Sequence, residues 1–145
     1  MRIALAFVIA VLGCYLLAAT FASMHVLDHL SNMNIEIPLA LSVQTIWHDW
    51  LGLTGIFLPV SVVAMGIGLS VAYLLLRLPV LQSLTTLAYV SAGAVALVAI
   101  HLVLNLVFDI HPIAVSRTFG GLAMQGLAGA VGGWLFLWRS GIGAR

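Results

Sequence analysis

Apolar residues fill four long runs of the chain, and none of these runs contains a charged side chain. The runs cover residues 3–27, 50–76, 78–108 and 118–138. A helix needs about 20 apolar residues to cross the core of a bilayer, and each run is long enough. Backbone groups inside a membrane must pair with one another, which favours helices. We therefore predict four transmembrane helices, near residues 3–24, 50–76, 84–108 and 113–138.

The composition supports this class of protein. Of the 145 residues, 63% are hydrophobic and 6% are charged, and the mean hydropathy is +1.23. Soluble domains are about 45–50% apolar and about 25% charged, so a soluble enzyme is excluded. A net charge of +1 gives no basic surface for a nucleic acid. The single cysteine, Cys14, excludes an internal disulfide and is expected to be a small packing residue. We expect an all-α integral membrane protein, with residues 1–145 forming one four-helix bundle.

The arginines predict how this bundle is oriented. Arg2, Arg77, Arg139 and Arg145 lie on one side of the predicted topology, and only Arg117 lies on the other. Positively charged flanks favour the cytoplasmic side of a membrane. We therefore expect a multi-pass protein of the cell membrane with both termini in the cytoplasm.

The connection between the first two helices, residues 25–49, is long and polar, and it is expected on the outer side. Proline suits the first position of a helix, so the second helix could begin at Pro38. A straight helix over residues 38–76 would be about 58 Å long, well beyond the ~30 Å core of a bilayer. It must project outward, lie along the interface, or break, and Gly52, Gly55 and Pro59 are the expected points of a break.

A weak internal repeat is also present. Shifting the chain by 74 positions aligns residues 38–42 with 112–116 and residues 52–55 with 126–129. If the repeat is real, each copy contains one outward and one inward helix. The bundle would then be a parallel 2+2 repeat with its pseudo-twofold axis along the membrane normal.

Two histidines near the end of the first predicted helix suggest a metal site. His25 and His29 are four residues apart, so they share one helical face, with Asp28 beside them. His48, between Trp47 and Asp49, could supply a further ligand. Imidazole and carboxylate ligands suit zinc or copper. The alternative is a hydrated helix end with interfacial histidines.

A polar stripe on the third predicted helix gives the strongest functional signal. His101, Asn105 and Asp109 are spaced by four residues, and Gln125 lies on the helix that follows. A polar residue at this depth should face protein or trapped water. With Arg117, these residues could line a pocket for an ion or small ligand. The alternative is a buried hydrogen bond between His101 and Gln125.

The last predicted helix carries small residues as well as Arg117. Glycines at intervals of four let two helices approach closely, and such positions are Gly121, Gly129 and Gly133. This seam could pack within one chain or between copies. Arg117 is the single arginine on the outer side, and its natural partners are the carboxylates of Asp109 and Glu36.

Three functions follow from these residues. The first is a membrane protein with an outward-facing polar pocket that transports or binds an ion or small ligand. The second is a metal- or haem-dependent redox protein, in which His25 and His101 would be the two axial ligands of haem b. The third is a non-catalytic accessory subunit of a larger membrane complex. No catalytic motif is present, which argues against an enzyme, and so thin a bundle favours a homo-oligomer or a place in a complex.

Overall fold

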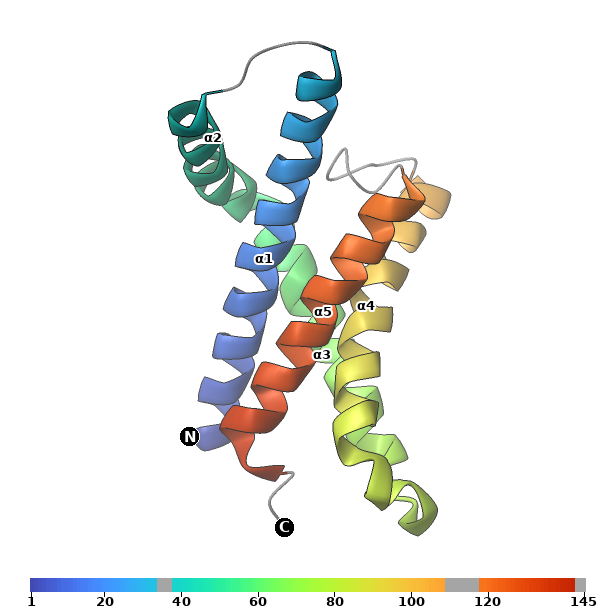
Figure 1. Cartoon of the computed structure of the whole chain (residues 1–145). Coiled ribbons are helices and arrows are strands. Elements are labelled where there is room, and N and C mark those ends of the chain that lie inside the picture. The colour runs from blue at the N-terminus through green and yellow to red at the C-terminus, as the bar shows by residue number, and fades with distance from the viewer. Residues whose placement is uncertain (34–37, 109–117, 143–145) are drawn as a thin grey trace.

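The computed structural model describes residues 1–33, 38–108 and 118–142, and every regular element in these ranges is helical (Figure 1). The elements are α1 (Arg2–Asn32), α2 (Leu39–Gly52), the 3-10 turn η1 (Leu53–Gly55), α3 (Phe57–Leu75), the 3-10 turn η2 (Pro79–Leu84), α4 (Thr85–Phe108) and α5 (Phe119–Ser140).

The prediction of four long apolar helices is confirmed. α1, α3, α4 with the preceding turn, and α5 are each long and apolar enough to cross a membrane. They run alternately up and down, so the beginning of α1 and the end of α5 lie at the same end of the bundle (Figure 1). We call this the terminal end and the opposite end the outer end.

The expectation that the first helix ends near residue 24 was wrong, whereas the helix expected from Pro38 onward is present. α1 continues to Asn32, and α2 occupies Leu39–Gly52. No glycine or proline interrupts the chain between Cys14 and Pro38, so the helix continues beyond the apolar run. The drop in hydropathy after residue 27 marks where the apolar surface ends, whereas the helix itself ends further along the chain, at Asn32. Pro38 is the N-cap of α2, in an extended conformation, rather than its first helical residue.

The predicted break in the second apolar helix is confirmed. α2 ends at Gly52, η1 follows over Leu53–Gly55, and α3 begins at Phe57. Pro59 lies in the first turn of α3, where a missing N–H costs no helical hydrogen bond. The break lets α2 lie beside the outer part of α1 (Figure 1). α4 begins one residue later than predicted, and residues 113–117 of the last predicted helix lie outside the described ranges.

Glycines allow α5 to fit closely between α1 and α4. A Cβ atom added to Gly129 would lie 2.2 Å from the carbonyl oxygen of Gly93, and one added to Gly133 would lie 2.1 Å from that of Tyr89. On the other side of α5, a Cβ on Gly132 would lie 2.9 Å from the Cβ of Cys14. The glycine seam therefore packs within one chain. Association into an oligomer stays a prediction, and this seam does not support it.

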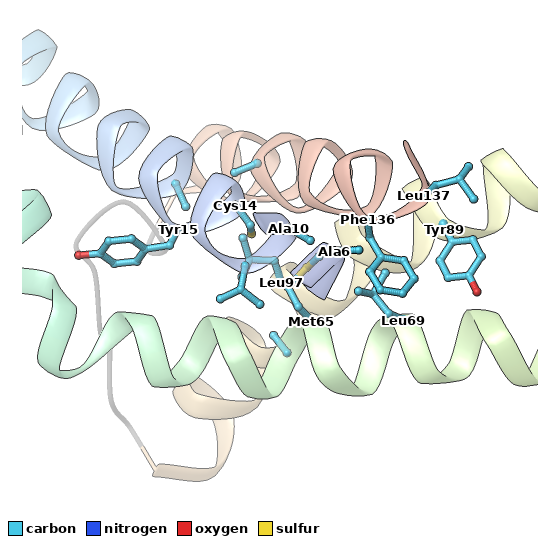
Figure 2. Packing of buried hydrophobic residues seen from close by; sticks show 14 of the residues in the cluster. Ala6, Ala10, Cys14, Tyr15, Met65, Leu69, Tyr89, Leu97, Phe136 and Leu137 are labelled. Atoms are coloured by element: carbon cyan, nitrogen blue, oxygen red, sulfur yellow. The ribbon is translucent and has the colours of Figure 1, made fainter. Parts of the chain in front are cut away.

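The apolar core runs along the inside of the four long helices. It joins small residues of α1 to larger side chains from the other three long helices (Figure 2). Cys14 is fully buried there, as expected of a packing residue. The larger members are Met65, Leu69, Tyr89, Leu97 and Phe136.

The glycines that suggested an internal repeat have different surroundings. Gly52 and Gly55 lie at the break between α2 and α3, with open space where a Cβ would be. Gly126 and Gly129 lie inside the continuous helix α5 and pack on α4. The glycine matches therefore do not mark equivalent positions, and residues 112–116 lie outside the described ranges.

Candidate functional site

Polar side chains hold α2 on the outer half of α1. Ser23, which is buried, donates a hydrogen bond from its Oγ to Oδ2 of Asp49 at 2.7 Å. The indole Nε1 of Trp50 donates to Oγ1 of Thr20 at 3.1 Å. His48, the residue before Asp49, is exposed. The acid and the second indole of the Trp-His-Asp-Trp segment thus dock one helix on another.

A third polar contact lies one to two turns deeper on α1. The hydroxyl of Tyr15 donates to the carbonyl oxygen of Trp50 and lies 3.1 Å from Oγ1 of Thr54. Sequence reasoning missed Tyr15, Thr20 and Ser23, because weakly polar residues hardly lower the hydropathy of an apolar run. The available signal was that they are the hydroxyl-bearing side chains in residues 3–27.

His101 is a deeply buried residue of the predicted pocket. It is 1% exposed, and its ring packs against Phe57 with the ring centroids 5.6 Å apart. Nδ1 lies 2.7 Å from the carbonyl oxygen of Leu97. A carbonyl can only accept, so Nδ1 carries the hydrogen and the neutral ring presents Nε2 as an acceptor. Nε2 is buried without a hydrogen-bond partner within the described part of the chain.

Gln125 repeats this arrangement on α5. Its side chain is fully buried, and Nε2 donates to the carbonyl oxygen of Ala18 at 3.1 Å. That bond orients the amide, and Oε1 is left buried with no partner among the described residues. The predicted hydrogen bond between His101 and Gln125 was therefore wrong. Each side chain donates instead to a backbone carbonyl oxygen within its reach, that of Leu97 for His101 and that of Ala18 for Gln125.

The two unpaired acceptors belong to α4 and α5, which pack on each other near these residues. A Cβ added to Gly126, the residue after Gln125, would lie 3.2 Å from Cγ2 of Val98, and Val98 lies three residues before His101. Asn105 is half-buried one turn closer to the outer end. The other two predicted pocket residues, Asp109 and Arg117, lie outside the described ranges, as does Glu36.

His25 and His29 form a pair at the outer end of α1. Their Nε2 atoms are 3.2 Å apart, and the rings meet edge to face at 85°. Nε2 of His25 also lies 3.3 Å from Oγ1 of Thr118, at the start of α5. Asp28 instead lines a groove of about 420 Å³ between α1 and α2.

The predicted metal set is therefore only partly assembled. Within residues 1–33, 38–108 and 118–142, no group of three or more histidine, cysteine or acidic side chains is arranged to hold a metal ion. His25 and His29 are brought together, whereas His48 is exposed on α2 and no contact joins it to the pair.

A haem held by His25 and His101 fits this geometry poorly. His25 is engaged with His29 and Thr118 at the outer end. His101 lies in the core, with Nε2 buried and Phe57 packed on its ring. A porphyrin could reach both nitrogens only by displacing packed side chains.

The two buried atoms left without a partner, Nε2 of His101 and Oε1 of Gln125, are both hydrogen-bond acceptors. Water, an ammonium group or another cation could satisfy the two acceptors, whereas an anion would be repelled by their lone pairs. No family model, curated protein or solved structure matches this chain.

Proposed function

We propose that this chain is a multi-pass membrane protein that binds a small cation or protonated ligand in the outer half of its bundle and allows it to pass. His101 and Gln125 would be the deepest contacts of the ligand. Asn105, Asp109 and Arg117 would line the approach from the outer side, with Asp109 supplying the negative charge that attracts a cation.

The observation that carries this proposal is the pair of unpaired buried acceptors, Nε2 of His101 and Oε1 of Gln125. A buried polar group without a partner costs about 1–3 kcal/mol. Hydrophobic side chains of similar size would avoid that cost. A ligand that donates to both atoms would recover it, which gives a reason for two acceptors in this position.

The distribution of arginines supports the proposed orientation. Arg2 begins α1, Arg77 follows α3 and Arg139 lies in the last turn of α5, so all three are at the terminal end (Figure 1). Positive charge favours the cytoplasmic side. The proposed ligand would then enter from outside, where the polar contacts of α1, α2 and α5 lie.

The test uses the purified chain reconstituted in liposomes. Proton entry is followed with an internal pH dye under a potassium diffusion potential, and uptake of radiolabelled methylammonium is followed in parallel. We expect wild-type flux of one of these cations above that of empty liposomes. His101→Leu and Gln125→Leu should each abolish it, because each removes an acceptor from the ligand's path.

His48→Gln is the matched control, because it changes an exposed histidine that makes no contact with His101, and it should retain wild-type flux. The proposal is wrong if neither cation crosses faster than in empty liposomes. It is equally wrong if His101→Leu and Gln125→Leu conduct like wild type, because flux would then not depend on these two acceptors.

A further inference from the structure

We infer that His25 and His29 form an exchangeable zinc site at the outer end of the bundle. This site is separate from the proposed ligand site, because it lies on the surface of α1 and beside Thr118, while His101 and Gln125 lie in the core. Neither site depends on the other.

The separation of the two ring nitrogens carries this inference. Zinc binds imidazole nitrogen at about 2.0–2.1 Å with tetrahedral geometry, so two nitrogen ligands of one ion lie about 3.3–3.4 Å apart. The Nε2 atoms of His25 and His29 are 3.2 Å apart. Two adjacent ligands in a square plane, the geometry preferred by Cu(II), would be closer, at about 2.8 Å. The observed spacing therefore favours zinc.

The rings also have the freedom that a metal site needs. His25 is half-buried and His29 is exposed, so an ion can reach them from solvent. Without metal, one Nε2–H donates to the other Nε2. To bind zinc, each neutral ring must carry its hydrogen on Nδ1, so the shared hydrogen moves to Nδ1 of its own ring and both Nε2 lone pairs face the ion.

Two protein ligands leave two positions of a tetrahedral ion open, which water would fill. Because no described acidic or cysteine side chain completes the site, zinc should bind weakly and exchange readily. Oγ1 of Thr118, 3.3 Å from Nε2 of His25, places the start of α5 against the ion. Zinc bound at Nε2 would take the place of the hydrogen bond between these two side chains, and its preference for the folded chain should raise the melting temperature.

The experiment uses protein in detergent without a polyhistidine tag, titrated calorimetrically with ZnCl₂. We expect one zinc per chain and a rise in melting temperature with zinc. His25→Gln and His29→Gln should each weaken binding at least tenfold, since loss of even an outer-shell partner weakens metal sites about 10–100-fold. Co²⁺, as a spectroscopic substitute, should show the strong visible bands of tetrahedral coordination.

His48→Gln and Asp28→Asn are the matched controls and should bind zinc like wild type. Metal-free melting temperatures of His29→Gln, His48→Gln and Asp28→Asn should equal that of wild type, because these side chains are exposed. His25→Gln loses the contact with Thr118 and should melt slightly lower. The inference is overturned if the double variant His25→Gln, His29→Gln binds zinc as tightly as wild type. Equal loss of binding in His48→Gln would overturn it as well. A failure here leaves the cation proposal untouched, because liposome flux is measured without zinc.

Discussion

The two ends of the bundle are held together in different ways. Near the terminal end, α1, α4 and α5 meet through glycine and alanine, and backbone atoms come close to backbone atoms. Toward the outer end, hydroxyl, indole, imidazole and amide groups of Tyr15, Thr20, Ser23, His25 and Gln125 join the elements. Every hydrogen bond between different helices that we observe in the described ranges lies in this outer part.

This difference separates the roles of the two ends. Close backbone packing tolerates no additional atoms, so the terminal half is suited to hold a fixed shape. Hydrogen bonds between helices in membrane proteins average only about 0.6 kcal/mol, so the outer half can rearrange at low cost. Unpaired acceptors also occur in the outer half, where a ligand could enter.

The largest effect on stability is expected from adding a side-chain atom where Gly129 of α5 packs against Gly93 of α4. Gly129→Ala places a Cβ 2.2 Å from the carbonyl oxygen of Gly93, and the two helices must separate. We expect the free energy of unfolding, measured by SDS titration in mixed micelles, to fall by about 3 kcal/mol, the upper end of the cost of overpacking. Gly120→Ala, on the same helix but with open space around it, should be neutral or stabilising by up to about 1 kcal/mol. Equal stability of the two variants would contradict the packing described for this half.

A smaller and more local effect is expected where α2 docks on α1. Ser23→Ala removes the donor to Asp49 and leaves the carboxylate without that partner, at a cost of about 1–3 kcal/mol. Hydrogen exchange of the amides in α2 should become faster, while exchange in α5 stays unchanged. His48→Ala, at the exposed residue before Asp49, serves as the control. Exchange in α2 at the wild-type rate in Ser23→Ala would show that this contact does not hold the helix.

The smallest change in stability is expected at Gln125. Gln125→Leu removes an unpaired buried acceptor and also the hydrogen bond to Ala18, and it keeps a similar volume. The gain and the loss nearly cancel, so the free energy of unfolding should change by less than about 1 kcal/mol. Gln125→Ala removes the same acceptor but leaves a cavity, and should lose about 2 kcal/mol. Both are measured by the same SDS titration. If the leucine variant were as unstable as the alanine variant, Oε1 would have a partner that the fold requires.

Much of the fold could be predicted because hydropathy and helix breakers act locally. The four long apolar helices, the break near Gly52, Gly55 and Pro59, and the burial of Cys14 all follow from composition and residue type. The end of α1 was misjudged because hydropathy says where apolar surface stops, and the backbone continued as a helix to Asn32.

The candidate site was only partly predictable. The spacing of His101 and Gln125 indicated that they should be buried, and both are. Their partners could not be predicted, because the carbonyl oxygens of Leu97 and Ala18 carry no sequence signal. The pairing of His25 with His29 followed from helical spacing, whereas the exclusion of His48 depended on how α2 lies against α1.

By itself, the sequence determined the helical class, the apolar segments and the positions at which chemistry is possible, because these depend on residue type and on spacing along one helix. Only the tertiary structure decided that the glycines of α5 are used against α1 and α4, that Ser23 binds Asp49, and that two buried acceptors are left without donors. Those outcomes depend on which faces of different helices meet, and that is set by the packing of the whole bundle.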